Sequence, residues 1–195
     1  MPYAKEIDVD LILTTGVIRD LIATGFVEQI LNTIPATNFP LQVYEDYHSR
    51  NEIQSKQNFT NSDQDFLNNL YNLVDKDLLS LADLKSDEEF HDFSSQTWDS
   101  RLPKQRFGAI ICGLAKHRKW IVACNDRKTM NLLNTFNPKS RYVTAIDLIK
   151  NWTDLAYVDQ FDLHQVLAKL KSVNIVPVNS HPHYSWWKNK IKQLH

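Results

Sequence analysis

The chain has 195 residues, of which 43% are hydrophobic and 23% are charged, and its formal net charge is −1. These values are ordinary for a globular protein, and the length allows one sizeable core. Because the net charge is close to zero, it gives no indication of a nucleic-acid partner. Such a partner has to be inferred from the local distribution of charge. The four glycines and seven prolines favour long helices over a sandwich of many short strands.

The chain shows no export or membrane signal. Residues 1–10 are charged and lack the apolar core of a signal peptide. No stretch reaches the roughly 18 apolar residues that a membrane span needs. Cys112 and Cys124 form neither a CxxC pair nor a zinc-type cluster, so we expect two buried, reduced thiols. The sequence therefore predicts a cytoplasmic protein without membrane contact.

Short apolar strands alternate with amphipathic helices from the start of the chain. A buried strand is expected at Val9–Leu13. Apolar residues then recur at helical spacing over 17–31, where Gly25 divides the stretch into two helices or a kinked one. An extended piece ends at Phe39, and Pro40 opens the next helix at its first turn.

The alternation continues through the second half. Residues 62–82 have a strongly helical pattern, whereas residues 83–101 are acidic and predict short helices or a mobile insertion. A helix begins at Pro103, and the apolar run Trp120–Cys124 is typical of a strand covered on both faces. The remaining expected elements are a helix at 129–136, a strand at 141–145, a helix at 147–152 and a last helix after Asp159.

Strands that alternate with helices predict an α/β fold with a central, mostly parallel sheet flanked by helices in three layers. Ligands of such sheets bind at the carboxyl ends of the strands. We expect a single domain over residues 1–195, with a helical and acidic insertion at about 60–101.

Several local motifs, in this order, resemble a PIN-like domain, the fold of VapC-type toxin ribonucleases of bacterial toxin–antitoxin pairs. They are the turn 14–16 with the glycine-started helix 25–31, the helix 40–47, the helix and strand of 106–127, and the tail from 147 to 178. The resemblance covers nearly the whole chain. It implies the PIN-like three-layer fold and a metal-dependent ribonuclease site.

In such domains four carboxylates meet at the strand ends and hold one or two Mg²⁺ or Mn²⁺ ions, which activate water and neutralise the transition state. The resemblance places the second acid at Asp46 and the fourth at Asp126, as catalytic residues and metal ligands. The first acid position falls on Thr14, a neutral hydroxyl that would position water, with Asn125 as the alternative. The third falls on Gly108, so the acidic site is incomplete.

Other acids enter through alternative alignments. Glu45 takes the place of Asp46 if the alignment slips by one residue. Asp8, with Asp10, belongs to a second register of the opening motif. Asp99 would have to fold back from the acidic segment to replace the third acid.

The sequence on both sides of the fourth acid position is basic, with Asp126 as its carboxylate. Lys104, Arg106, Arg127 and Lys128 frame the expected site and would hold RNA phosphates, although such a run is more commonly a solvated face. Asp126 has a second interpretation as the cap of the helix that follows it.

The stretch His181–Trp187 is rich in histidine and aromatic residues. Such side chains can stack on bases or bind a metal. More commonly they close the core or pack on a partner.

Two functional hypotheses follow. The first is a PIN-like protein that binds RNA, or cleaves it as a Mg²⁺-dependent endoribonuclease with an incomplete carboxylate site. The alternative is a pseudonuclease that kept the fold, lost the chemistry and binds RNA or protein, for example in a toxin–antitoxin or defence context. RNA, a protein partner such as an antitoxin, and a homo-oligomer are all compatible with the sequence.

Overall fold

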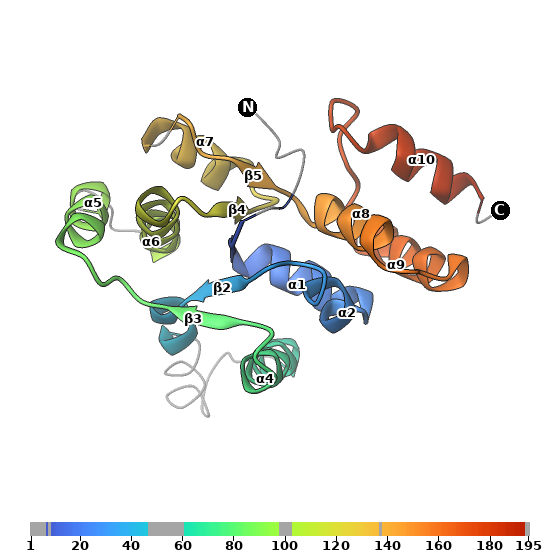
Figure 1. Cartoon of the computed structure of the whole chain (residues 1–195), viewed down its shortest axis with the longest axis horizontal. Coiled ribbons are helices and arrows are strands. Elements are labelled where there is room, and N and C mark those ends of the chain that lie inside the picture. The colour runs from blue at the N-terminus through green and yellow to red at the C-terminus, as the bar shows by residue number, and fades with distance from the viewer. Residues whose placement is uncertain (1–6, 8, 47–60, 98–102, 137, 194–195) are drawn as a thin grey trace.

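The structure is a computed structural model that describes residues 7, 9–46, 61–97, 103–136 and 138–193. Its centre is one sheet of five strands that all run parallel (Figure 1). The strands are β1 (Leu11–Leu13), β2 (Thr37–Pro40), β3 (Ser80–Ala82), β4 (Ile121–Ala123) and β5 (Tyr142–Val143). The predicted α/β fold with a parallel central sheet is confirmed.

The strand order β3-β2-β1-β4-β5 places β1 in the middle. Leu11 pairs with Thr37 of β2 on one side and with Ile121 of β4 on the other. The chain moves outward from β1 to β3 and then returns to build β4 and β5 on the opposite side. The strand order therefore reverses between β1 and β4, and the carboxyl ends beside such a reversal are the usual ligand site of an open α/β sheet.

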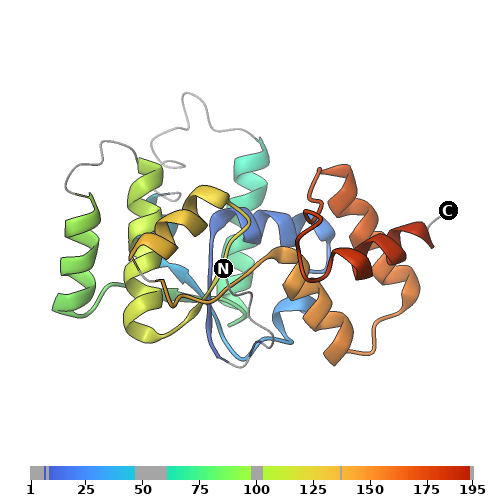
Figure 2. The same cartoon turned by 90° about the horizontal axis from the view of Figure 1, so that it is seen from above.

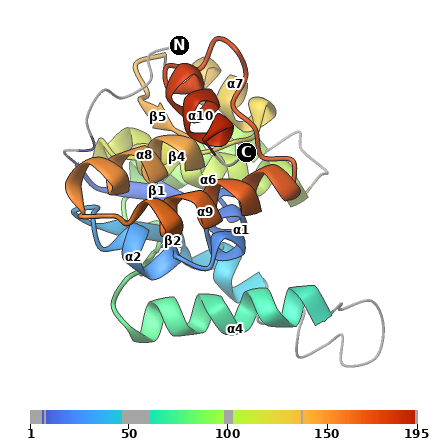
Figure 3. The same ribbon diagram turned by 90° about the vertical axis from the view of Figure 1, so that its right-hand side faces the viewer.

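Helices cover both faces of the sheet, as Figure 2 shows from above. One face carries α1 (Thr15–Thr24), α2 (Val27–Leu31), α4 (Asn61–Asp75), α8 (Ala145–Leu155), α9 (Gln160–Ser172) and α10 (Tyr184–Lys192). The other face carries α5 (Asp87–Thr97), α6 (Pro103–Arg118) and α7 (Arg127–Phe136). Figure 3 shows α4 at one end of the first layer and α10 at the other. Residues 41–46, directly after β2, are helical as well.

The middle strand explains why an unbroken apolar run predicts a strand here. Leu11 and Leu13 pack in the core on the α1 side, whereas Ile12 packs in the core on the α6 side. Ile121 and Val122 of β4 divide in the same way. Successive side chains of a strand point to opposite faces, so a strand with helices on both faces is apolar throughout.

The expected break of the first helical stretch is confirmed. Gly25 follows α1 with a φ of 79°, a left-handed backbone that favours glycine. Helix α1 therefore ends at Thr24, and α2 begins at Val27.

The helix predicted over residues 62–82 is partly wrong. It ends at Asp75 because Asp77 takes a left-handed φ of 56°, and the Leu78 and Asp77 amides donate back to the carbonyls of Leu73 and Val74. The chain then forms β3, which pairs with β2. The range expected to be an insertion thus supplies an edge strand of the sheet.

Two other features bear on the site. Helix α10 was not predicted, since the last expected helix corresponds to α9; its Trp187 and Ile191 complete the core on the α1 side. Within the described ranges no helix is both long enough and apolar enough to cross a membrane.

Candidate functional site

The predicted catalytic residues follow strands that end at one edge of the sheet. Thr14 comes directly after β1, and its backbone N–H donates to the Ala123 carbonyl of β4 at 3.0 Å. Asp126 follows β4, so Thr14 and Asp126 lie at neighbouring strand ends. The half-buried Asp46 ends the helical residues that follow β2. Strand β1 therefore lies between the strand ends that precede Asp46 and Asp126.

Asp126 is a helix cap. Its Oδ2 accepts hydrogen bonds from the Thr129 backbone N–H and hydroxyl, both at 2.8 Å. Burial raises the pKa of Asp126, but the hydrogen bonds from Thr129 and the nearby Lys128 outweigh it, so the pKa lies below its ordinary value. One carboxylate oxygen of the fourth acid position thus stabilises the start of α7.

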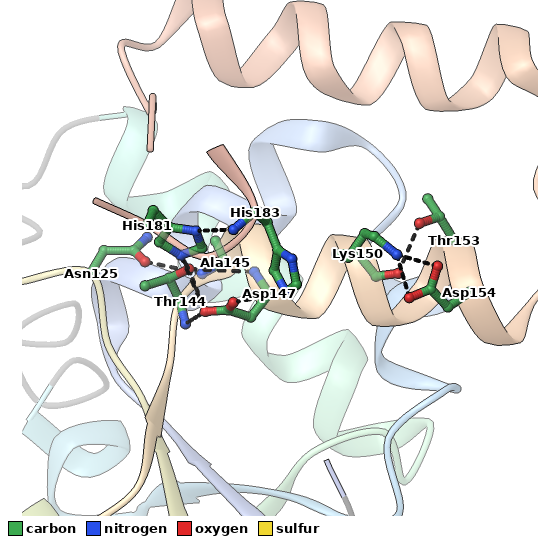
Figure 4. Close-up of polar contacts among 9 residues, drawn as sticks. All are labelled: Asn125, Thr144, Ala145, Asp147, Lys150, Thr153, Asp154, His181 and His183. Atoms are coloured by element: carbon green, nitrogen blue, oxygen red, sulfur yellow. Dashed lines mark hydrogen bonds and ion pairs between the residues drawn. The ribbon is translucent and has the colours of Figure 1, made fainter. Parts of the chain in front are cut away.

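Asn125 links three elements across the same edge. Its Nδ2 donates to the Asp20 carboxylate on α1. Its Oδ1 accepts from the Ala145 backbone N–H of α8 at 3.0 Å, as Figure 4 shows. Both ends of the amide therefore make a hydrogen bond, and Asn125 connects the end of β4 to α1 and α8.

Asp20 was not a predicted site residue. It is the carboxylate that meets Asn125, and burial raises its pKa, with the Asn125 hydrogen bond opposing that shift. In the sequence Asp20 is one polar position of an amphipathic helix. Only its partner, 105 residues away, distinguishes it.

Of the three alternative acids, the structure describes Glu45. Glu45 is exposed beside Asp46. Asp8 and Asp99 lie outside the described residues. Gly108, at the third acid position, has no side chain to offer a metal.

These positions do not fit a two-ion centre. Thr14 and Asn125 are neutral, and Asp126 already caps α7 through Oδ2. Over the described ranges no group of three or more His, Cys, Asp or Glu side chains could hold an ion. Binding of Mg²⁺ or Mn²⁺ stays a prediction.

The predicted basic residues fall into two groups. Arg127 and Lys128 are exposed in the first turn of α7, at the carboxyl edge of the sheet. Lys104 and Arg106 belong to the N-terminal part of α6, and their side chains lie outside the described residues. The structure therefore places Arg127 and Lys128 beside Asp126.

Both cysteines are buried free thiols, as expected. Burial raises the pKa of Cys112 to about 12 and that of Cys124 to about 11. Neither thiol is reactive near neutral pH, because the thiolate is the nucleophile.

A cavity of about 680 Å³ opens at this edge, beyond the ends of β4 and β5. Its size is that of a typical small-ligand site. The lining residues are Asp20, Asn125, Arg127, Met130 and Asn131, then Tyr142, Thr144 and Ile146, and from the segment before α10 Asn174, Ile175, Val176, Pro177, Val178, Ser180 and His181. Helices from both faces of the sheet thus contribute to one pocket.

A buried polar cluster holds one wall of the cavity in place (Figure 4). Asp147 Oδ2 accepts from the Thr144 backbone N–H at 2.7 Å and Thr144 Oγ1 accepts from the Asp147 backbone N–H at 3.4 Å, which forms a capping box at the start of α8. The Thr144 hydroxyl also donates to Asp147 Oδ2 at 2.8 Å. His181 Nε2 lies 3.0 Å from the Thr144 hydroxyl, and His183 Nε2 lies 3.4 Å from Asp147 Oδ1. The segment that carries the two histidines is thereby anchored to α8.

The geometry also indicates the tautomer of His181. Its Nδ1 accepts the His183 backbone N–H at 3.1 Å, so the proton of a neutral ring resides on Nε2. Nε2–H then donates to Thr144 Oγ1, whose own proton points to Asp147. His181 and Trp187 are buried, so these two side chains of the stretch His181–Trp187 close the core, as one of the two interpretations predicted.

Comparison with protein-family models, with curated proteins and with solved structures found no match for this chain. What the fold and site define is an α/β protein with an all-parallel five-stranded sheet and a ligand-sized cavity at its carboxyl edge. The PIN-like resemblance rests on the sequence motifs.

Proposed function

We propose that this chain is a PIN-like RNA-binding pseudonuclease, which uses the carboxyl edge of its sheet to bind RNA without metal-dependent cleavage. The observation that carries the proposal is the set of hydrogen bonds made by the side chains at and beside the fourth acid position. Asn125 and Asp126 make hydrogen bonds that hold α1, α7 and α8 in place. Side chains committed in this way serve the fold at the point where the related nucleases place catalytic acids.

The same edge offers what an RNA strand requires. Arg127 lines the cavity and Lys128 is exposed beside it, so two cations lie at the N-terminal end of α7, where the helix dipole also favours an anion. Phosphate contacts of this type give binding that tolerates different sequences and weakens with salt. The adjoining apolar wall, Ile175–Val178, suits an unstacked base.

Binding is tested by fluorescence anisotropy of a labelled, mixed-sequence single-stranded RNA in EDTA. We expect the wild type to bind, and the double variant R127E/K128E to bind at least about tenfold more weakly with a shallower salt dependence. The matched control is K188E/K192E, which makes the same charge change on exposed lysines of α10, away from the cavity. An equal loss of RNA affinity in both double variants would show that the RNA responds only to the overall charge of the protein, and it would contradict the proposed site.

Cleavage is tested separately with an RNA pool in Mg²⁺ or Mn²⁺. We expect intact RNA in both metals. Metal-dependent cleavage by the wild type that Asp126→Asn abolishes would overturn the pseudonuclease proposal in favour of the ribonuclease.

A further inference from the structure

The cavity has a charged group on each of two sides. Asp20 comes from α1, which covers one face of the sheet, and Arg127 comes from α7, which covers the other. Asn125 lies between them at the end of β4 and bonds to Asp20. A ligand that fills the cavity therefore meets an acceptor on one side and a cation on the other.

The acceptor side has one carboxylate. Of the described residues that line the cavity, Asp20 is the acidic one. Asn125 donates to its Oδ2, which fixes the orientation of the carboxylate, while Oδ1 and the second lone pair of Oδ2 can still accept the two donors of a ligand. A half-buried acceptor that receives a ligand donor gains a charge-assisted hydrogen bond.

The Asp20 carboxylate determines which base fits best, because the base has to supply the hydrogen-bond donors. On the Watson–Crick edges of the bases, guanine presents two adjacent donors, the N1–H and the N2 amino group. Adenine and cytosine each present one amino group next to an acceptor, and uracil presents one N–H between two acceptors. An ionised carboxylate only accepts hydrogen bonds, so guanine matches it best.

The remaining groups suit the rest of a nucleotide. Arg127 carries a guanidinium, whose planar donors match a phosphate. The apolar wall Ile175–Val178 offers a surface for the face of a base. This wall is held by the bonds of His181 to Thr144, so it exists before a ligand arrives.

We infer that the cavity binds one guanine nucleotide unit, with the Asp20 carboxylate on the Watson–Crick edge of the base and Arg127 on its phosphate. The inference rests on the proposed function, since it names the nucleotide of the bound RNA that enters the cavity.

Calorimetric titration of the full chain with GMP, IMP, AMP, CMP and UMP tests the inference. IMP differs from GMP by the absent N2 amino group. We expect GMP to bind at least about tenfold more tightly than IMP or AMP, the ratio expected when a donor to a charged group is lost. Asp20→Asn should bring GMP and IMP within about threefold of each other, because an amide no longer accepts two donors as a carboxylate does.

Two further variants complete the design. Arg127→Ala should lower the affinity for GMP to that for guanosine and leave guanosine unchanged. Asp65→Asn removes the same charge from an exposed position of α4 and should keep the wild-type preference. The amide oxygen that Asp20→Asn introduces still accepts from Asn125, so this variant retains that contact, and a thermal melt checks its fold.

The outcomes separate the inference from the proposed function. RNA binding without preference for GMP, or a preference that Asp20→Asn retains, overturns the inference and leaves RNA binding in place. Selective GMP binding without RNA binding supports the cavity chemistry and overturns the RNA-binding function. Binding of neither RNA nor GMP overturns both.

Discussion

The side-chain amide of Asn125 donates a hydrogen bond to the carboxylate of Asp20, which lies 105 residues earlier in the chain. The bond connects the end of β4 to α1 at the point where the strand order reverses. Burial raises the pKa of Asp20, so the ionised carboxylate depends on the Asn125 donor for stabilisation. An acid at position 125 would place a second carboxylate against the first. Asn125 and Asp20 therefore form one structural unit.

The first prediction concerns Asn125→Asp. We expect the free energy of unfolding at pH 7 to fall by about 2 kcal/mol, because Asp20 loses its donor and gains a like charge. Repulsion raises the pKa of the pair in the folded state. The decrease in the free energy of unfolding should therefore become smaller as the pH falls through that raised pKa, because one carboxyl becomes protonated and donates a hydrogen bond to the other. Urea unfolding at pH 7 and pH 5 measures both effects.

The double variant N125D/D20N is the control for that prediction. It exchanges donor and acceptor between the two positions, so the new amide on α1 can donate to the new carboxylate after β4, and most of the stability should return. A double variant as unstable as Asn125→Asp would show that the two side chains do not act as a pair.

The second prediction concerns Asp126→Ala. Loss of the cap should lower the free energy of unfolding by about 1 kcal/mol, while Asp126→Ser, which keeps a capping oxygen, should lose less than about half of that. The pKa of Asp126 is lowered in the fold, so its contribution is present above the ordinary Asp pKa and is lost as the pH falls through the lower folded value. Urea unfolding of the three proteins is the measurement. Equal stability of Asp126→Ala and the wild type would refute the capping role.

Much of the fold could be predicted from local sequence. The run Leu11–Leu13 is apolar throughout because helices cover both of its faces, and Gly25 marks a helix end because its backbone is left-handed. The helix end at Asp75 was missed, since the left-handed residue that follows it is Asp77, and aspartate adopts a left-handed φ far less often than glycine does. Strand β3 was missed with it, because three residues at the edge of a sheet carry little periodicity.

The candidate site was less predictable. The positions of Thr14 and Asp126 at neighbouring strand ends followed from strand order along a parallel sheet. The partners Asp20 with Asn125 and Thr144 with His181 are 105 and 37 residues apart. No spacing rule connects such pairs, since they depend on how helices from two faces meet at one edge. The capping role of Asp126 was foreseeable from its place before a helix.

The third prediction concerns Glu89, which joins α5 to α6. Glu89 Oε1 accepts from Arg118 Nε at 2.7 Å, and Oε2 accepts from the Lys85 backbone N–H at 2.7 Å. Burial raises the pKa of Glu89, but these hydrogen bonds outweigh it and lower the pKa to about 2 from 4.5. The stability that this shift contributes is present above the unfolded pKa and is lost as the pH falls from about 4.5 to about 2.

We expect the wild type to lose about 3 kcal/mol more than Glu89→Gln between pH 5 and pH 2. The measurement is urea unfolding of both proteins at a series of pH values. Asp87→Asn, an exposed position in the first turn of the same helix, is the control and should follow the wild type. Parallel curves for the wild type and Glu89→Gln would contradict the assignment.

The fourth prediction concerns Asp147→Ala, which removes the centre of the buried cluster beside the cavity. Asp147 is 5% exposed, and its loss leaves the Thr144 N–H and hydroxyl without their acceptor and His183 without its nearby carboxylate. We expect the free energy of unfolding to fall by about 3 kcal/mol, the size expected when buried donors lose a charged partner.

The control for Asp147→Ala lies on the same helix. Asp154 pairs with Lys150 at four-residue spacing, and its side chain is 57% exposed, so Asp154→Ala should cost less than about 0.5 kcal/mol. Limited proteolysis gives a second readout, because loss of the anchor should expose residues 174–183 to cleavage in Asp147→Ala and not in Asp154→Ala. If the two variants are equally stable and equally resistant, the cluster does not hold the cavity wall.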